Sequence, residues 1–321
     1  MKVLVTGGAG SIGLEVVRKL LDEGHEVTIL DLAEQIERSV IPEDAKVFKG
    51  SILDSVAIHH ALQGNDYVVH LAARLGVKRT EVERLSCLHI NINGMVNILD
   101  AAVKERVEKI LFSSSSEVYG NQAKMPITEE SALNPVSVYA VTKLAGEEYL
   151  KAYKRQYGLD YTILRFFNVY GPGQVGQFVM KKFIDAVKQD KSPQIYGSGD
   201  QIRCFCHVKD AANGIVKALF APQTSEEVIN IGNDMEQITM LALAEKVIAL
   251  SGKDIKPKKI SFSESDRQEK REVFDRIPSI EKAKRLLDYT PQISIDEGIK
   301  ELLCSENNSS DWSDYRAVKA T

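Results

Sequence analysis

The glycine-rich run Thr-Gly-Gly-Ala-Gly-Ser-Ile-Gly at residues 6–13 constrains the fold of this chain more than any other feature. It follows a short apolar segment, residues 2–5, and opens a helical pattern with apolar residues at 14, 17, 20 and 21. Glycines permit a tight turn and let the backbone approach a pyrophosphate, which a helix N-terminus attracts. The run therefore predicts a dinucleotide-binding turn. Its expected contact residues are Gly7, Gly8, Gly10, Ser11, Ile12 and Gly13.

Asp31 indicates that the dinucleotide is NAD. It ends the second strand candidate, residues 26–30, close to the ~20-residue spacing from the glycines at which an acid accepts hydrogen bonds from ribose hydroxyls. A carboxylate at this place would repel the extra phosphate of NADP. The same Asp could instead cap a loop. Asp54, after residues 50–53, could reach the adenine or cap the helix that follows.

Strand and helix patterns alternate through the first half of the chain, which predicts right-handed crossovers and a doubly wound parallel (Rossmann) α/β sheet. The further strand candidates have near-continuous apolar runs, as a sheet buried on both faces requires. These strands are expected at 46–49, 67–71, 109–112 and 161–166, with helices at 92–103 and 141–157 between them. After residues 171–173 the expected elements are helices at 178–188, 211–220, 241–250 and 281–288 and strand-like sequence at 202–208.

This pattern divides the chain into three parts. We expect an NAD-binding Rossmann domain at 1–168 and a smaller, mainly substrate-binding lobe at 169–304, of which some segments return to the sheet. A polar tail follows at 305–321.

The composition suits one large or two modest domains, with 321 residues, 44% hydrophobic residues and a net charge of -4. The slight acidity gives no support for nucleic-acid binding, and no apolar run approaches the ~18 residues of a membrane span. The chain enters a strand at once, which argues against a signal peptide. The four cysteines form no metal-binding pattern, so we expect no metal and a reducing, cytoplasmic setting. They are Cys87, Cys204, Cys206 and Cys304.

Tyr139 and Lys143 are the main catalytic candidates. They lie four residues apart at the start of a helical pattern, so they share one face. A phenol with a pKa of ~10 is a poor base at neutral pH, and a nearby ammonium lowers that pKa. A phenolate beside a nicotinamide can remove a hydroxyl proton while hydride leaves the adjacent carbon. Such a pair alone is usually surface decoration, but after a dinucleotide turn it indicates a catalytic pair.

A serine run at 113–116, followed by Glu117, ends the strand candidate that precedes this helix. Hydroxyls at the carboxyl edge of a sheet can donate to the oxygen that gains or loses a proton. A Ser-rich loop without such a role is also common.

These elements together resemble the extended short-chain dehydrogenase/reductase family, in its NAD-dependent nucleotide-sugar epimerase/dehydratase branch. The resemblance covers nearly the whole chain. The glycine turn and Tyr-x-x-x-Lys indicate only the wider family, whereas Asn-x-Tyr-Gly and Gly-x-Gly-x-x-x-Arg narrow it to nucleotide sugars. The remaining segments that carry it are 70–73, 91–94, 165–171 and 196–203.

The resemblance implies a shared first step. Tyr139 would take the proton of the sugar C4 hydroxyl while NAD takes the C4 hydride, with Ser115 bonded to the same oxygen and Lys143 to the nicotinamide ribose. It further implies cofactor contacts at Leu71, Ala72, Ala73 and Asn91. The implied substrate contacts are Ser115, Ser116, Asn168, Gln177, Phe178, Val179, Arg203 and Arg276. The arginines suit the sugar diphosphate because their forks pair with phosphate oxygens, although Arg203 could instead form a salt bridge between lobes.

Glu117 favours chemistry at C5 after the oxidation. Family members that only invert C4 need no group beyond the shared Tyr and Ser or Thr. Members that eliminate water or lose carbon dioxide usually carry an acid at the position of Glu117. The ketone acidifies the C5 proton, and a carboxylate can remove it. Ser116 replaces the Asp of the Thr-Asp-Glu found in dTDP-glucose 4,6-dehydratases, which weakens that subclass. The interpretation therefore leans to a 4,6-dehydratase type, with a UDP-glucose 4-epimerase-like enzyme as the alternative if Glu117 only caps a loop.

Three other interpretations are open. A UDP-glucuronate decarboxylase-like enzyme needs a cation for the substrate carboxylate, for which Arg74, Lys78 and Arg79 are candidates. A non-catalytic NAD-binding protein usually loses the Tyr or the Lys, and both stand here. An NADPH-dependent reductase would release its cofactor. The resemblance also implies a homodimer, packed through the Tyr139 helix and the long helix before it.

Overall fold

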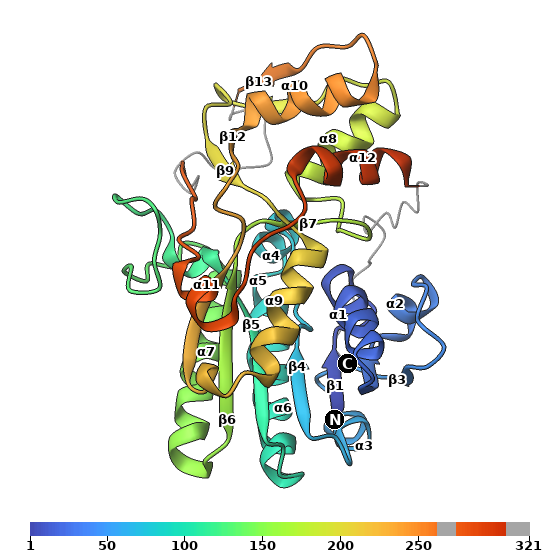
Figure 1. Ribbon diagram of the computed structural model, residues 1–321, viewed down its shortest axis with the longest axis vertical. Helices are drawn as coiled ribbons and strands as arrows, with labels where there is room; N and C mark the ends of the chain where they lie inside the picture. Colours follow the sequence, from blue (N-terminus) through green and yellow to red (C-terminus); the bar gives the residue numbers. More distant parts are fainter. Residues whose placement is uncertain (262–273, 306–321) are drawn as a thin grey trace.

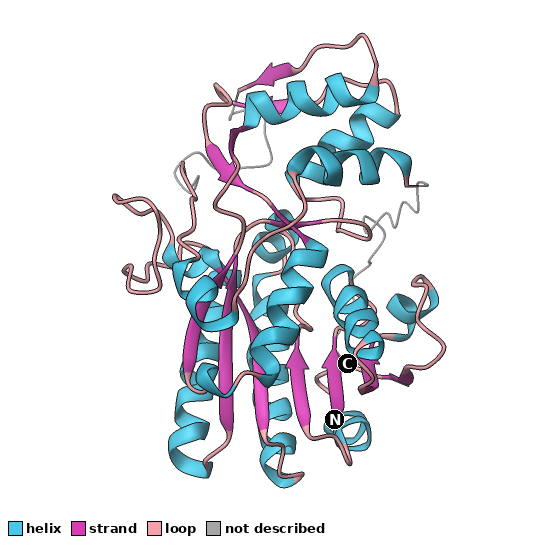
Figure 2. Ribbon diagram, viewed as in Figure 1, coloured by secondary structure: helices cyan, strands magenta, loops and turns pink. Residues whose placement is uncertain are grey.

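A parallel sheet organises the larger lobe of the protein (Figures 1 and 2). The computed structural model describes residues 1–261 and 274–305, except for the side chains of residues 77 and 78. The seven strands lie in the order β11-β6-β5-β4-β1-β2-β3. They are β1 (Lys2–Thr6), β2 (Glu26–Asp31), β3 (Lys46–Lys49), β4 (Tyr67–His70), β5 (Lys109–Ser115), β6 (Asp160–Phe166) and β11 (Glu227–Ile231).

Successive strand residues point to opposite faces of the sheet, and here both sets are apolar. Helices therefore cover both faces. One face carries Val3, Val5 and Ile29, which pack against α1 (Ser11–Asp22), α9 (Val208–Phe220) and α11 (Glu281–Leu287). The other face carries Leu4, Val68 and Ile110, which pack against α3 (Ser55–Leu62), α6 (Gly94–Lys104) and α7 (Val138–Tyr157). The doubly wound α/β sheet that the sequence predicts is thus confirmed.

The long helix α7 shows how local sequence sets the ends of these elements. Its N-cap residue, Ser137, accepts a hydrogen bond from the backbone of Ala140 at 3.0 Å. At the other end Gly158 has φ 76°, the left-handed conformation that commonly ends helices. The helix therefore begins three residues earlier than the predicted residue 141, at Val138.

The smaller lobe lies beyond the carboxyl ends of the strands, at the top of Figure 1. Its core forms between α8 (Val179–Lys188), α10 (Met240–Ser251) and α12 (Ile295–Cys304). Short strands pair around it: β7 (Val169–Tyr170) with β10 (Cys206–His207), β8 (Gln194–Tyr196) with β13 (Lys258–Ile260), and β9 (Ile202–Cys204) with β12 (Gln237–Thr239). The remaining elements are α2 (Ala33–Glu37), α4 (Val77–Val82), α5 (Arg84–Leu88), η1 (His89–Asn93), η2 (Ser116–Tyr119) and η3 (Pro222–Thr224).

Strand β11 extends the sheet with residues that come after position 168. It pairs with β6 in parallel, from Glu227 opposite Thr162 to Ile231 opposite Phe166. The sequence does not predict this strand, because the segment is only five residues long and contains the polar Glu227 and Asn230. Asn230 is fully buried, and its amide oxygen accepts a hydrogen bond from Tyr119. A tertiary partner thus satisfies a residue that argues against a buried strand.

A further difference is local. The helix expected from residue 92 is preceded by a π-helical turn, η1, which joins it to α5. Residues 50–53, after β3, form a turn that leads into α3. The polar tail predicted at 305–321 lies outside the described residues, apart from Ser305.

Candidate active site

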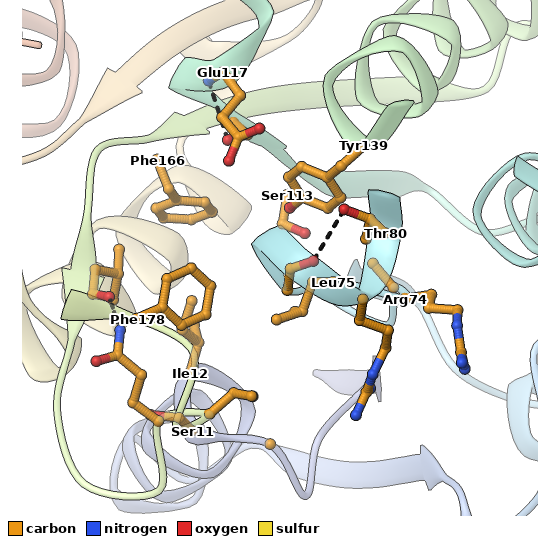
Figure 3. Close-up of a pocket in the computed structure, with 18 of the residues that line it drawn as sticks. Ser11, Ile12, Arg74, Leu75, Thr80, Ser113, Glu117, Tyr139, Phe166 and Phe178 are labelled. Carbon is orange, nitrogen blue, oxygen red and sulfur yellow. Dashed lines mark hydrogen bonds between the residues drawn. The ribbon is translucent and has the colours of Figure 1, made fainter. Parts of the chain in front are cut away.

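A cavity of about 880 Å³ lies at the carboxyl edge of the sheet, between the two lobes. Residues from the glycine turn, from the ends of β2, β4 and β5, from α7 and from the smaller lobe all line it. Figure 3 shows Glu117 and Tyr139 on one side and Ser11, Ile12 and Phe178 on the other. The edge at which parallel strands end is where open α/β sheets bind ligands.

The glycine turn is packed too tightly for side chains. A Cβ at Gly13 would lie 2.2 Å from the carbonyl oxygen of Gly7, and Gly7 itself has φ 72°. Helix α1 begins directly after Gly10, whose position provides no side-chain cap. The amides of its first turn are therefore open to an anion, as a pyrophosphate requires. Of the predicted residues, Gly7, Gly10, Ser11, Ile12 and Gly13 line the cavity.

Gly8 does not line the cavity, since its missing side chain makes room for a neighbour. A Cβ there would lie 2.9 Å from the side chain of Ile29 in β2. Gly8 therefore serves the packing of the turn against the sheet.

Asp31 lies at the end of β2, as predicted, and lines the cavity. Its carboxylate accepts hydrogen bonds from the backbone of Ala9 at 3.0 Å and of Leu32 at 2.8 Å. Burial raises the pKa of Asp31, and the two backbone hydrogen bonds oppose that rise. Asp54 instead caps α3, where it accepts from Val56 and Ala57, and it does not line the cavity.

The segment after β4 joins the site in two ways. Leu71, Ala72 and Ala73 line the cavity, as expected for cofactor contacts. Asn91 is buried behind them, where its amide group bonds both the backbone nitrogen and the backbone oxygen of Arg74, at 2.7 and 3.1 Å. The same amide donates to Thr142 of α7 at 3.0 Å. Asn91 thus holds this segment against α7 and does not line the cavity.

Lys143 is fixed at the end of β5. Its Nζ donates to the carbonyl oxygen of Ser113 at 2.6 Å and lies 5.6 Å from the centre of the Tyr139 ring. Burial lowers the pKa of Lys143 to about 7, and the charges of Cys87 and Glu147 oppose that shift.

The surroundings of Tyr139 disfavour ionisation of its phenol, whereas the sequence predicts a lowered pKa. Burial raises its pKa above the ordinary value, and the charges of Glu117 and Cys87 add to the rise. A positive charge nearby, such as that of the Lys143 ammonium, opposes such a rise.

The serine run turns from strand to 3₁₀ helix at the cavity. Ser115 accepts a hydrogen bond from the backbone of Glu117 at 3.2 Å, and Ser137 donates to a carboxylate oxygen of Glu117 at 2.8 Å. Ser115, Ser116 and Glu117 line the cavity, but Ser116 is only 1% exposed. Glu117 therefore both reaches the cavity and braces the start of α7.

Most of the predicted substrate residues meet on the other side of the cavity. Asn168, Phe178, Val179, Arg203 and Arg276 line it, whereas Gln177 does not. The two arginines come from distant segments that meet in a parallel bridge, and Arg203 donates to the carbonyl oxygen of Phe274 at 2.6 Å. The Gln177 side chain instead packs against Gly76.

Two of the three cationic side chains proposed to bind a substrate carboxylate lie at the cavity. Arg74 and Arg79 line the cavity, and Arg74 forms an ion pair with Glu83. The side chain of Lys78 lies outside the described residues.

Sequence reasoning missed several residues of the site. Ser113 holds Lys143, and Lys182, Tyr196 and Met240 line the smaller-lobe side of the cavity. His70 lies beside the site: its Nδ1 is 2.7 Å from the hydroxyl oxygen of Thr6, and burial lowers its pKa to about 3. Tyr196 and His70 belong to the segments 196–203 and 70–73, which carry the family resemblance, but Lys182 and Met240 carry no local signal.

Two classes of feature are not found in the part of the chain that the structure describes. No cluster of His, Cys, Asp or Glu there could hold a metal ion. None of the described helices is long and apolar enough to cross a membrane.

Comparisons with known proteins agree with this geometry. The sequence model of the NAD dependent epimerase/dehydratase family matches residues 3–232. A putative UDP-glucose 4-epimerase of Methanocaldococcus jannaschii is 34% identical, over 94% of this chain and 97% of that protein. A UDP-N-acetyl-alpha-D-glucosaminuronate decarboxylase of Bacillus cytotoxicus is 33% identical, over 94% and 96%. The crystal structure of UDP-glucuronic acid 4-epimerase from Bacillus cereus, in complex with UDP-glucuronic acid and NAD, superposes with a TM-score of 0.86 at 30% identity, covering 94% and 98%.

Proposed function

Since the chain belongs to the NAD dependent epimerase/dehydratase family, we propose that it inverts a nucleotide-diphosphate sugar at C4 through a transient 4-ketone. Membership makes it an NAD-dependent enzyme of the nucleotide-sugar epimerase/dehydratase class. The observation that carries the proposal is the meeting of Tyr139, Lys143 and Ser115 with the glycine turn in one cavity.

The residues of the cofactor half fit NAD. The uncapped first turn of α1 suits the pyrophosphate, and the carboxylate of Asp31 suits the adenosine ribose. Bound NAD supplies the acceptor for the C4 hydrogen and a positive ring charge close to Tyr139. We assign Tyr139 to take the proton of the C4 hydroxyl and to return it, Ser115 to hydrogen-bond the same oxygen, and Lys143 to bind the nicotinamide ribose.

The substrate half suits a diphosphate that is anchored away from the reacting carbon. Arg203 and Arg276 can pair with diphosphate oxygens, since each guanidinium presents a planar fork of donors. Asn168 and Phe178 also line the cavity, and we assign them to the sugar and its neighbourhood. The UDP-sugar names of the relatives support a uridine nucleotide.

The residue at position 116 bears on the step that follows oxidation. Elimination of water needs an acid for the leaving hydroxyl, and at the place where dehydratases carry Asp this chain has Ser116, which is 1% exposed. Inversion at C4 needs only Tyr139 and Ser115, with the ketone presenting its other face when hydrogen returns. We therefore place 4-epimerisation ahead of the elimination that the sequence favours.

The test is incubation of the purified protein with UDP-, dTDP-, GDP- and CDP-sugars, with products followed by mass and NMR. A product of unchanged mass with inverted C4 supports the proposal. Loss of one water indicates elimination and loss of carbon dioxide indicates decarboxylation, and either outcome replaces 4-epimerisation. Bound NAD with no turnover of any sugar would identify a non-catalytic protein.

Elimination through C5 is the second candidate, because a carboxylate does reach the cavity. Glu117 lies close enough to Tyr139 to raise the pKa of the phenol. If Glu117 is the C5 base, Glu117→Gln abolishes uptake of solvent deuterium at C5. If Glu117 only braces α7, Glu117→Gln retains most of the turnover, since an amide oxygen can still accept from Ser137, and wild type shows no uptake.

We further propose a homodimer through α6 and α7. Helix α7 exposes the apolar or aromatic side chains of Val141 (43%), Tyr149 (37%) and Tyr157 (52%), which gives it apolar area to bury. Light scattering that shows a monomer at micromolar concentration would contradict the homodimer.

We also propose domain boundaries at residues 168 and 304, which limited proteolysis would test. A cytoplasmic location is a further proposal, which cell fractionation would test.

A further inference from the structure

A buried charged pair lies directly behind the catalytic residues. Glu147 is fully buried and Arg165 is 3% exposed, and two hydrogen bonds join them, from Nε of Arg165 at 2.9 Å and from its Nη2 at 2.6 Å. Ser114 donates to the same carboxylate at 2.5 Å. Neither Glu147 nor Arg165 lines the cavity, so neither can touch a ligand there.

The pair is continuous with the catalytic groups through two elements. On α7, Tyr139, Lys143 and Glu147 follow at intervals of four and so share one face. On β5, Ser113 accepts from Lys143 and the next residue, Ser114, donates to Glu147, while Ser115 reaches the cavity. The helix and the strand that carry the catalytic groups are therefore fastened together at two successive points.

Arg165 extends the connection toward the smaller lobe. Its Nη1 donates to the Tyr119 hydroxyl at 2.9 Å, and Tyr119 donates to Asn230 of β11 at 2.7 Å. Asn230 donates in turn to the carbonyl oxygens of Ile127 and Ser279, at 3.1 and 3.4 Å. Ser279 lies three residues after Arg276 in the chain.

We propose that Glu147, clamped by Arg165 and Ser114, is a positioning residue that holds the Lys143 ammonium and the end of β5 in register with Tyr139. The proposal rests on the catalytic roles assigned above. A buried ion pair is poor support for stability as such, because apolar residues of similar volume often serve as well. A pair placed one helical turn from Lys143 can instead maintain the position and charge of the ammonium.

The groups that face Lys143 are Tyr139 and Glu147 from α7, Ser113 from β5, His70 from β4 and Cys87 from α5. Glu147 raises the pKa of Lys143 against the effect of burial. Removal of that negative charge lowers the pKa of Lys143, so the ammonium is lost at a lower pH.

The decisive variant is Glu147→Gln, with Lys109→Met as the matched control. Lys109 is 5% exposed and lies at the opposite end of β5, where its Nζ donates to Thr224 and to backbone carbonyls. Both substitutions remove a buried charge close to the same strand, but only one adjoins Lys143. In Glu147→Gln we expect kcat to fall about 10- to 100-fold with little change in KM, and the basic limb of the kcat profile to move down by on the order of one pH unit. Lys109→Met should lower the melting temperature and leave the profile in place.

Two further measurements apply if the variant does not fold or if no sugar is turned over. If Glu147→Gln does not fold because Arg165 is left unpaired, the double variant Glu147→Gln/Arg165→Met removes both charges and should restore folding; its pH profile is then compared. Titration of ¹³C-labelled lysine by NMR, with Lys143→Met for assignment, follows the ammonium without any substrate. A lower Lys143 pKa in the variant supports the proposal even if no sugar is turned over, which would defeat only the proposed function. An unchanged profile and an unchanged lysine titration would show that the pair is purely structural.

Discussion

The cofactor half and the substrate half of the cavity are built in different ways. The cofactor half uses short segments that each lie at the carboxyl end of a strand of the main sheet: the glycine turn at 7–13 after β1, Asp31 at the end of β2 and the segment 71–73 after β4. The substrate half joins Asn168, Phe178, Arg203 and Arg276, which come from separate segments and meet through short strand pairs and a single bridge.

The two halves also differ in the substitutions that they can tolerate. A turn that works through its backbone depends on the absence of side chains, and a Cβ at Gly7 or Gly13 would overlap backbone atoms. The substrate half works through side chains on a second core, made by α8, α10 and α12. Substitutions in the first half should therefore act on NAD binding, and those in the second on the sugar nucleotide.

The largest expected effect lies where the halves meet. Tyr139→Phe should lower kcat by roughly 10²- to 10⁴-fold, the usual contribution of a positioned acid–base group, because only the proton-transferring hydroxyl is removed. NAD affinity should change little. The matched control is Tyr157→Phe at the exposed end of the same helix. Unchanged turnover in Tyr139→Phe would remove the catalytic assignment.

A substitution in the glycine turn should damage the cofactor half alone. In Gly13→Ala the new Cβ would lie 2.2 Å from the oxygen of Gly7, an overlap that we expect to cost roughly 3 kcal/mol, or about 100-fold in NAD affinity. Calorimetry with NAD measures it. Gly176→Ala is the control, since a Cβ there meets nothing within 4 Å. Equal NAD affinity in the two variants would contradict the tight-turn explanation.

Loss of a substrate cation should leave the cofactor half intact. Arg203→Ala removes charge-assisted hydrogen bonds worth about 1.5–3 kcal/mol, so we expect KM for the sugar nucleotide to rise roughly 10- to 100-fold with NAD affinity unchanged. Lys191→Ala removes an exposed cation of the same lobe as a control. A fall in NAD affinity in Arg203→Ala would show that the two halves are not independent.

The smallest expected effect concerns acid stability. Burial lowers the pKa of His70 to about 3 in the folded protein, against an ordinary value near 6.5. Between these values the unfolded chain binds the proton and the folded chain does not, so stability falls as the pH drops from about 6.5 toward 3. His70→Gln should flatten that fall in melting temperature, whereas His60→Gln, at an exposed position, should not. Identical slopes in all three proteins would exclude His70 as the cause.

Much of the cofactor half could be predicted because its signals are local. A strand, a glycine turn and a helix follow each other within the first 22 residues, and the Tyr139 and Lys143 pair lies on one helix. Asp54 shows the limit of such reasoning: the same carboxylate fits a cofactor contact or a helix cap, and only the structure shows the cap. Gln177 and Asn91 likewise face neighbouring backbone and not the cavity.

The sequence by itself determined the alternating α/β fold, the glycine turn and the helix that carries Tyr139 and Lys143, because apolar periodicity, glycine sterics and helical spacing act between residues that are close in the chain. Only the tertiary structure decided that β11 completes the sheet, that Glu117 is bonded to Ser137, and that Arg165 meets Glu147 behind the catalytic lysine. Burial and the pairing of charges across elements depend on contacts between distant residues, and no local pattern specifies them.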